Sequence, residues 1–230
     1  MNKIFFSLII FGVLFAGCKT TQSQTKKDSK MSKTEKGAVI GGSSGAVIGG
    51  IIGNKKNNTA LGAILGAAVG GTIGVIIGNK MDKQAKKLEE DLGKTATVER
   101  VGEGIKVTFN SQLLFDFGKT TLKESNKADL QKLAETLTQN PDTNLLIVGH
   151  TDNVGSESFN NNLSKKRASA VSYQLTSAGV SSSRLKVQGK GESQPTVSND
   201  TEDSRSQNRR VEIAIYANNK MKAEAEKEIN

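Results

Sequence analysis

The residues best suited to chemistry are Asp152 and Arg167, which flank a stretch predicted to run from a strand through a loop into a helix. Residues 145–148 form an unbroken apolar run, which is typical of a strand buried on both faces. The polar loop 149–155 follows at the strand's carboxyl end, where mixed and parallel sheets usually place ligands. With Asp152 on this loop and Arg167 about one turn into the next helix, the two side chains can form opposite walls of one cleft. Such a cleft suits a zwitterion, because a carboxylate binds an ammonium group and a guanidinium binds a carboxylate in bidentate fashion.

A longer set of spaced residues resembles the signature of the OmpA-like peptidoglycan-binding domain. The matching residues are Gly149, His150, Thr151, Asp152, Gly155, Asn160, Leu163, Ser164, Arg167, Ala168, Val171, Gly179, Val180, Arg184, Gly189, Gly191, Pro195, Asn199, Arg205, Asn208, Arg209, Arg210, Val211 and Glu212. The resemblance covers roughly residues 101–217, about half of the chain. It implies a non-catalytic domain that grips the diaminopimelate residue of the peptidoglycan stem peptide. Asp152 would bind the ammonium group, and Arg167 the carboxylate, of that residue's free end.

The same resemblance adds residues to the expected peptidoglycan site. These are Asp116, Phe117, Thr151, Asn160, Leu163, Asn208 and Arg209. In the family, the pair at Asp116 and Phe117 lies beside the bound peptide, and some relatives carry a further acid where this chain has Gly118. The residues alone leave an equal alternative, in which Phe115 and Phe117 are core residues and Asp116 starts a helix. One of Arg209 and Arg210 is expected to serve the ligand and the other a salt bridge of the fold, and the sequence does not say which.

Catalytic and metal sites find little support in the sequence. His150 is the one histidine, and it is accompanied neither by a Ser nucleophile motif nor by a second soft ligand. We therefore predict no enzyme, no cofactor and no metal, and expect His150 to fix its loop through hydrogen bonds. A basic cluster is formed by Arg205, Asn208, Arg209 and Arg210, but without interleaved aromatic residues it does not predict nucleic-acid binding.

The amino terminus indicates secretion and a lipid anchor. Residues 1–17 combine Lys3 with a short apolar run and are predicted to be a signal peptide. Cys18 is the only cysteine, and the residues before it resemble a bacterial lipoprotein processing site, so we expect lipidation there. Residues 18–36 are polar and predict a disordered tether. The net charge of +9 favours an anionic neighbourhood such as a phospholipid surface or a cell-wall polymer.

Residues 37–80 contain an internal glycine repeat. Glycine recurs every four residues at positions 37, 41, 45, 49 and 53, and again at 62, 66, 70, 74 and 78. This spacing puts the glycines of each half on one helical stripe, which favours close helix approach and resembles the glycine zipper of bacterial envelope lipoproteins. A flexible linker would not repeat the same sequence in register. We expect a helical hairpin with its turn at 55–58; membrane insertion, an in-plane position and self-association all remain open.

The remaining pattern predicts an α+β fold. We expect a linker over 81–96 that begins as a helix, which Gly93 ends. The OmpA-like domain spans 97–218, and a polar tail covers 219–230. Within the domain we expect two strands around residues 102–104, a helix over 121–140 and a helix capped by Ser164. A strand over 185–189, a polar loop over 193–207 and a last strand over 211–215 complete it. The sum is a small α/β sandwich of βαβαβ type, a mixed sheet with helices on one face, preceded by the glycine-zipper hairpin.

Together these patterns predict an outer-membrane lipoprotein with its carboxyl-terminal domain in the periplasm. Lipid at Cys18, helped by residues 37–80, would hold the outer membrane, while the domain would hold the peptidoglycan. Two charge-assisted contacts predict weak binding at a single site, which many anchored copies would strengthen through avidity. The alternative is an oligomeric membrane pore or envelope assembly component that the wall-binding domain only positions.

Overall fold

The computed structural model describes residues 58–229. The predicted signal peptide, Cys18, the tether and the first half of the glycine repeat lie outside these residues. The helices are α2 (Thr59–Ala67), α3 (Gly71–Leu92), α4 (Ser111–Leu114), α5 (Glu124–Gln139), α6 (Glu157–Ser177), the 3-10 turn η3 (Ser182–Arg184), α7 (Glu202–Asn208) and α8 (Asn219–Lys227). The strands are β1 (Ala96–Val101), β2 (Gly104–Asn110), β3 (Thr143–Gly149), β4 (Leu185–Gly189) and β5 (Arg210–Ala217).

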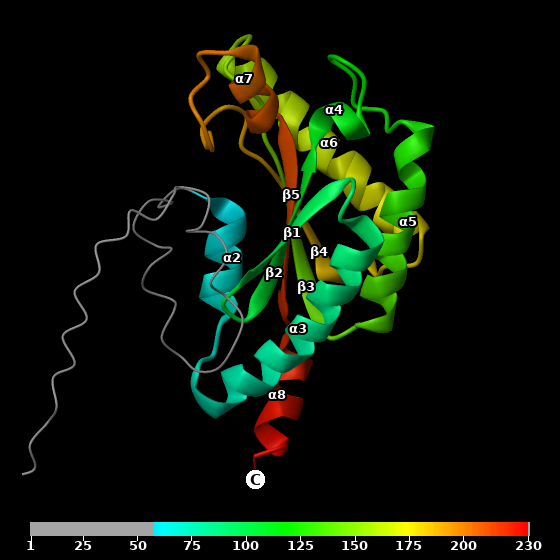
Figure 1. Cartoon of the computed structure of the whole chain (residues 1–230), viewed down its shortest axis with the longest axis vertical. Coiled ribbons are helices and arrows are strands. Elements are labelled where there is room, and N and C mark those ends of the chain that lie inside the picture. Colours follow the sequence, from blue (N-terminus) through cyan, green and yellow to red (C-terminus); the bar gives the residue numbers. More distant parts are fainter. Residues whose placement is uncertain (1–57, 230) are drawn as a thin grey trace, which may run out of the picture. The chain divides into compact units, whose positions relative to one another are not determined.

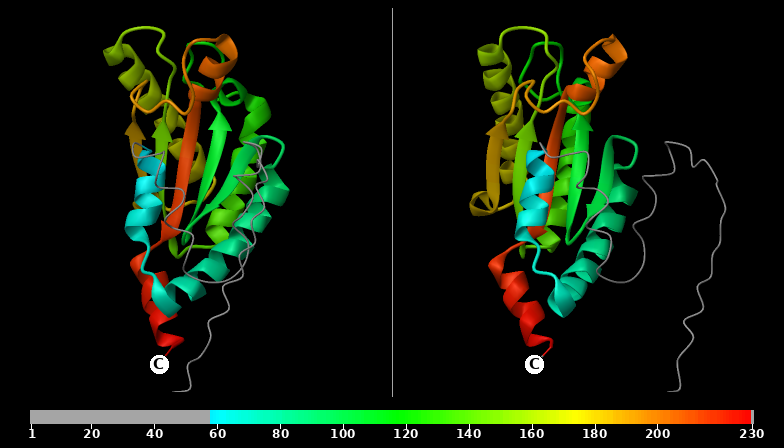
Figure 2. Two further views of the ribbon diagram at one scale, coloured as in Figure 1. Left: turned by 60° about the vertical axis from the view of Figure 1, so that its left-hand side comes forward. Right: turned by 90° about the vertical axis from the view of Figure 1, so that its left-hand side faces the viewer.

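The five strands form one mixed sheet in the order β1-β2-β5-β3-β4, which Figure 1 shows nearly edge-on and Figure 2 shows from its face. Only β3 and β4 run parallel, and the other neighbouring pairs are antiparallel. β3 lies between β5 and β4 and is covered on both sides: Leu145 and Ile147 face one apolar cluster, while Leu146 and Val148 face the other. This arrangement confirms the prediction of a strand buried on both faces.

The main core lies on the face covered by α3, α5 and α6. Leu130, Leu133 and Leu137 of α5 are fully buried there, as the apolar stripe of that segment predicts. They pack with the inward residues of β2 and β5, among them Val107 and Ile213. This face holds most of the buried apolar side chains of the described residues, so it is the principal source of hydrophobic stabilisation.

The opposite face of the sheet is covered by α2, the one helix of the described residues that lies against it in both views of Figure 2. Leu61 and Ile64 of α2 pack on Leu146, Val148 and Ala214. The domain's own helices α5 and α6 cover one face of the sheet, as predicted, and the cover of the other face comes from the glycine segment ahead of the domain. The physical reason is that β3 carries apolar residues on both faces, and the second set needs a cover.

The described half of the glycine repeat forms two helices rather than one continuous stripe. The chain turns between α2 and α3, where Gly70 and Gly71 adopt φ angles of 75° and 61°. At this turn the Glu103 carboxylate accepts hydrogen bonds from the backbone N–H groups of Val69 and Gly70, at 2.8 and 2.6 Å. A Cβ atom at Gly74 would lie 2.2 Å from a Glu103 oxygen, so that glycine makes room for the β1–β2 turn. Within residues 58–229, no helix has the length and apolar character needed to cross a bilayer.

Two local predictions near the site are wrong. Ser164 does not cap a helix, because α6 begins at Glu157 and is capped by Ser156, whose hydroxyl accepts from the Phe159 N–H. Arg167 consequently lies about three turns into α6 rather than one. The segment 193–207, expected to be a loop, contains α7, which starts with a capping box formed by Thr201 and Ser204. The predicted helix end near Gly179 is confirmed, since α6 stops at Ser177 and Gly179 has a φ of 100°.

Candidate functional site

A hollow of about 150 Å³ opens where α4, α6 and the start of β5 meet. Its walls come from the turn after β2, from α6 and from the residue before β5. The lining residues are Ser111, Gln112, Phe115, Asp116, Phe117, Lys123, Arg167 and Arg209. Three of these side chains are cationic and one is acidic, so the hollow favours an anionic group.

Arg167 forms the α6 wall of the hollow. Its side chain is buried, with 5% exposure, and its guanidinium carbon lies 5.3 Å from the centre of the Phe115 ring. Its Nε donates to the Lys119 carbonyl at 3.1 Å, and among the described residues its terminal nitrogens have no hydrogen-bond partner. Burial and the nearby charge of Arg209 lower the pKa of Arg167, while the charge of Asp152 opposes them. The fork of Arg167 is thus held in place and available to an anion.

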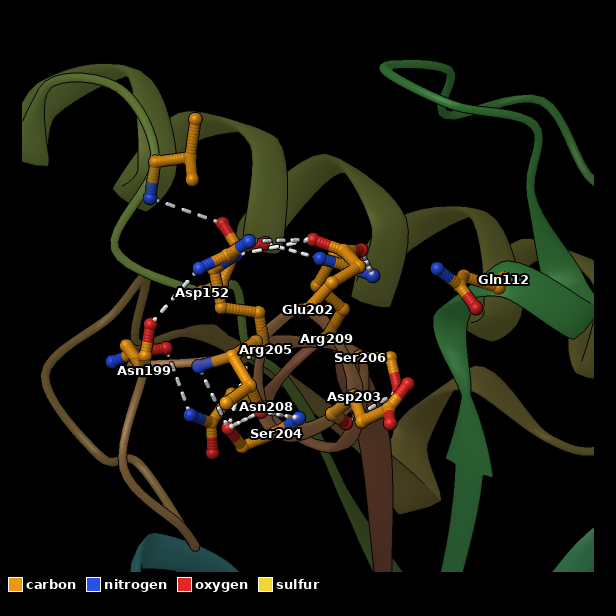
Figure 3. Close-up of polar contacts among 12 residues, drawn as sticks. Gln112, Asp152, Asn199, Glu202, Asp203, Ser204, Arg205, Ser206, Asn208 and Arg209 are labelled. Carbon is orange, nitrogen blue, oxygen red and sulfur yellow. Dashed lines mark hydrogen bonds and ion pairs between the residues drawn. The ribbon is translucent and has the colours of Figure 1, made fainter.

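Arg209 lies between two carboxylates at the other side of the hollow. Figure 3 shows it beside Asp152 and Glu202, with Gln112 further along the rim. Its two terminal nitrogens bind Asp152 Oδ2 and Glu202 Oε1, each at 2.5 Å. Burial alone would lower the pKa of Arg209, but these two hydrogen bonds raise it above its ordinary value. The hydrogen bond to Arg209 also lowers the pKa of the Glu202 carboxyl.

Asp152 occupies a different position from the one expected. Its side chain is buried beside the hollow but is not among the lining residues, and it binds Arg209 directly. Its second oxygen accepts from the Val154 N–H at 3.1 Å, which closes the loop after β3. The acid and the guanidinium of Arg167 are close enough for the Asp152 charge to act on the pKa of Arg167. Arg209, however, and not Asp152, forms the wall that faces Arg167.

The neighbouring arginines have different surroundings. Arg210 is buried on the α2 side of the sheet, where its Nε binds Glu212 at 2.8 Å. Its other nitrogens donate to the carbonyls of Asn208 and Gln194, at 3.2 and 3.0 Å. Arg210 therefore serves the fold, whereas Arg209 lines the hollow.

Two predicted site residues brace the loops around the hollow instead of lining it. Asn160 is buried in α6 and donates to the carbonyls of Asp152 and Val154, at 3.3 and 3.2 Å, and to the Glu192 carboxylate at 2.6 Å. Asn208 is fully buried and fixes the loop before α7 through hydrogen bonds to Val197. Their amides satisfy backbone groups of irregular segments that would otherwise lack partners.

Thr151 and Leu163 complete the predicted set near the α6 end of the site. Thr151 is buried, and its N–H donates to the Gly191 carbonyl at 2.9 Å. Its hydroxyl has no hydrogen-bond partner among the described residues. Leu163 is half-buried on α6. Neither residue lines the hollow.

Asp116 and Phe117 stand at the exposed rim of the hollow. Phe117 is 96% exposed, so its assignment to the core is wrong, while Phe115 is buried as a core residue. Asp116 lies after α4, and its carboxylate is 3.4 Å from the Lys123 ammonium.

His150 makes no side-chain hydrogen bond among the described residues, so the expectation that its ring fixes the loop is wrong. The ring is buried and its Nε2 lies 3.9 Å from a Glu212 oxygen. Burial, with the charge of Arg210, lowers the pKa of His150 to about 3. The loop is fixed instead by the His150 N–H, which donates to the Arg210 carbonyl at 2.9 Å.

Sequence reasoning missed five residues of the site: Ser111, Gln112, Phe115, Lys123 and Glu202. In an extended segment Phe115 and Phe117 would share one face, so their spacing gave no signal that one ring is buried and the other exposed. Glu202 comes close to Arg209 through α7, a helix that the polar sequence hid. Ser111 has a buried hydroxyl with no partner among the described residues.

Two family models match different parts of this chain. A model of the OmpA family matches residues 114–209, and a model of the YMGG-like Gly-zipper matches residues 1–82. The probable lipoprotein YiaD of Escherichia coli is 34% identical over 209 residues, covering 90% of this chain and 94% of YiaD. The outer-membrane lipoprotein YfiB of Pseudomonas aeruginosa is 35% identical over 115 residues, covering 50% of this chain and 68% of YfiB.

A solved structure shares the fold. The cell wall anchor of the T6SS from Pseudomonas aeruginosa superposes with a TM-score of 0.53 at 26% identity, covering 59% of this chain and 97% of that structure. The relatives named here are lipoproteins or a wall anchor, and none bears an enzyme's name. The similarity to YiaD over nearly the whole length, together with the two matching models, shows that this chain belongs to the OmpA family and carries a Gly-zipper segment ahead of its OmpA domain.

Proposed function

We propose that this protein is a non-catalytic outer-membrane lipoprotein that binds the diaminopimelate residue of peptidoglycan and so tethers the outer membrane to the cell wall. The observation that carries the proposal is Arg167, a buried guanidinium whose terminal nitrogens face no partner among the described residues. A buried cation held over an aromatic ring beside a hollow is a suitable receptor for a carboxylate.

The two ends of a dipolar ligand fit different parts of the site. The carboxylate binds Arg167. The ammonium group binds beside the hollow at Asp152, whose carboxylate retains acceptor capacity beyond its bonds to Val154 and Arg209. The exposed ring of Phe117 covers the ligand's methylene chain. Each charge-assisted contact is worth about 1.5–3 kcal/mol, so a single site binds weakly and many anchored copies supply avidity.

Further support comes from the relatives and from the glycine segment. One solved neighbour is a cell wall anchor, and two relatives are named as lipoproteins. The described part of the glycine segment buries Leu61, Ile64 and Ile77 within the same chain, which favours a tether over a pore built from that segment. The membrane end of the tether is lipid on Cys18, which labelled palmitate would detect in the wild type and not in a Cys18→Ala variant.

Sedimentation with purified peptidoglycan tests the proposal. Arg167→Met removes the carboxylate receptor and keeps much of the side chain's apolar volume, and we expect it to abolish co-sedimentation. Lys166→Met is the matched control, because it removes one positive charge from the neighbouring, exposed position on α6. Equal co-sedimentation of Arg167→Met and the wild type would overturn the proposal, provided that both variants keep the circular dichroism of the wild type.

A further inference from the structure

The start of α2 is bonded to a buried charged cluster behind the candidate site. The Asn58 side-chain nitrogen donates to both oxygens of the Glu212 carboxylate, at 3.0 and 2.9 Å. The adjacent Thr59 N–H donates to the side chain of Gln194 at 3.2 Å. Glu212 is 1% exposed, and Arg210 Nε donates to Oε1, one of the two oxygens that Asn58 binds. Asn58 therefore contributes two of the hydrogen bonds that this buried carboxylate requires.

Arg210 connects this cluster to the segments that carry Arg209 and Asp152. It directly follows Arg209, whose carbonyl accepts from the Ser111 N–H at 2.8 Å on the wall of the hollow. The carbonyl of Arg210 accepts from the His150 N–H, two residues before Asp152. Its guanidinium binds the Gln194 carbonyl, on the residue whose side chain meets α2. A shift of Arg210 would thus move the segments that carry Arg209 and Asp152 together.

The α2 cover is also the smaller of the two apolar contacts of the sheet. Its cluster contains Leu61, Ile64 and a few small or branched residues, whereas the opposite cluster contains most of the core. A helix held by few apolar contacts opens at lower free energy than the rest of a domain. The hydrogen bonds of Asn58 and Thr59 hold the start of this helix against the sheet.

We infer that Asn58 is a positioning residue for the binding site, so that docking of α2 and binding of ligand favour each other. This inference rests on the proposed function. When α2 is docked, Asn58 holds Glu212 and Arg210, which in turn hold Arg209 and Asp152 in the geometry that receives the dipolar ligand. Because coupling between two sites is reciprocal, ligand must stabilise docked α2 by the same factor.

A substitution series at Asn58 separates positioning from helix stability. The Asn58 oxygen also caps α2 by accepting from the Leu61 N–H at 2.8 Å. Asn, Ser and Asp are comparable caps, but Ser lacks the amide donor and Asp places a second carboxylate against Glu212. We expect the affinity of the full chain for a soluble muropeptide that carries diaminopimelate to fall about threefold or more in Asn58→Ser, and further in Asn58→Asp. If α2 acted only through its helical stability, all three proteins would bind alike.

Asn218→Ser is the matched control. Asn218 caps α8 in the same way, by accepting from the Met221 N–H at 2.9 Å, and α8 lies at the other end of the sheet (Figure 1). This variant should bind the muropeptide as the wild type does. A loss of affinity equal to that of Asn58→Ser would show that any weakened cap lowers binding, and would overturn the inference.

Hydrogen exchange measures the reciprocal effect. Saturating muropeptide should slow amide exchange in residues 61–65 of the wild type, and should slow it less in Asn58→Ser. Equal affinities across the Asn58 series, or α2 exchange that ligand does not change, would overturn the inference while leaving the proposed function intact. A wild-type protein that does not bind the muropeptide at all would instead remove the proposed function and, with it, this inference.

Discussion

The two faces of the sheet are covered in different ways, and the difference sets how each face responds to substitution and to pH. On the face of α3, α5 and α6, a large apolar cluster forms most of the core, and Arg167 of the hollow lies on α6. On the α2 face, a small apolar cluster lies beside buried charged or titratable groups, including Lys106, Glu212 and His150. A dry apolar face gives cooperative folding, while a buried polar face is stable only as long as every partner stays in place.

On each face of the sheet a helix packs closely against a glycine of a strand, Gly149 under α6 and Gly104 under α2. The largest effect is expected at Gly149. A Cβ atom at Gly149 would lie 2.0 Å from the backbone oxygen of Ser164, which cannot move without displacing α6. We expect Gly149→Ala to lower the free energy of unfolding by ~3 kcal/mol or more, because overpacking against backbone is not relieved by rotamer changes. Thermal or urea unfolding followed by circular dichroism measures the loss.

Gly62→Ala is the control for that variant. Gly62 lies on the exposed side of α2, and a Cβ atom there meets nothing within 4 Å. The variant should unfold like the wild type or be slightly more stable, since Ala favours helix over Gly by up to ~1 kcal/mol. Similar destabilisation by the two substitutions would contradict the distinction between the faces.

The polar face predicts a loss of stability in acid. Burial and Arg210 lower the pKa of His150 to about 3, against about 6.5 in the unfolded chain. Below pH 6.5 the unfolded state therefore binds a proton that the native state does not, and stability falls by up to ~1.4 kcal/mol per pH unit down to about pH 3. Burial would raise the pKa of Glu212, but the charge of Arg210 and its other neighbours outweighs burial, so this pKa is also lowered. Protonation of Glu212 in acid therefore lowers the stability of the native state further.

Urea unfolding of the wild type and of a His150→Gln variant between pH 7 and pH 4 isolates the histidine. The variant should show a smaller decrease in unfolding free energy over this range, whatever its stability at pH 7. Parallel pH profiles for the two proteins would show that His150 does not titrate as its burial requires.

A smaller effect is expected from truncation of the α2 cover. Ile64 is 1% exposed and packs over Gly104. In a central core such a truncation costs ~2–5 kcal/mol, but α2 is able to detach locally, so we expect Ile64→Ala to cost less than ~2 kcal/mol in global unfolding. Faster amide exchange confined to residues 60–67 would support this. A full core penalty with no local change would show that α2 unfolds only with the whole domain.

The sequence predicted the elements whose patterns are local. The alternating apolar residues of β2 and β5 and the apolar stripe of α5 were sufficient for these elements, because each pattern has the period of its own secondary structure. The start of α6 was missed because its first turns are polar, and α7 because Glu202 and its neighbours read as a loop. Neither carries an apolar stripe that periodicity detects.

The sequence predicted several residues of the site, but not which of them form ion pairs with one another. Arg167 and Arg209 do line one hollow, but the ion pair between Asp152 and Arg209 joins residues far apart in the chain, and spacing carries no information about such a pair. The role of Arg210 likewise depends on Glu212, two residues later on the same face of β5, and on a helix at the other end of the sequence. Tertiary contacts of this kind appear only when the fold is known.

The central claim is that Arg167 receives a carboxylate of a dipolar amino acid. Lysine differs from diaminopimelate by the absence of one terminal carboxylate, so two otherwise identical muropeptides isolate that group. Calorimetric titration of the full chain should show binding of the diaminopimelate form at least about tenfold tighter than of the lysine form, the equivalent of one lost charge-assisted contact. In Arg167→Met the two affinities should become equal. Equal binding of both muropeptides by the wild type would contradict the claim.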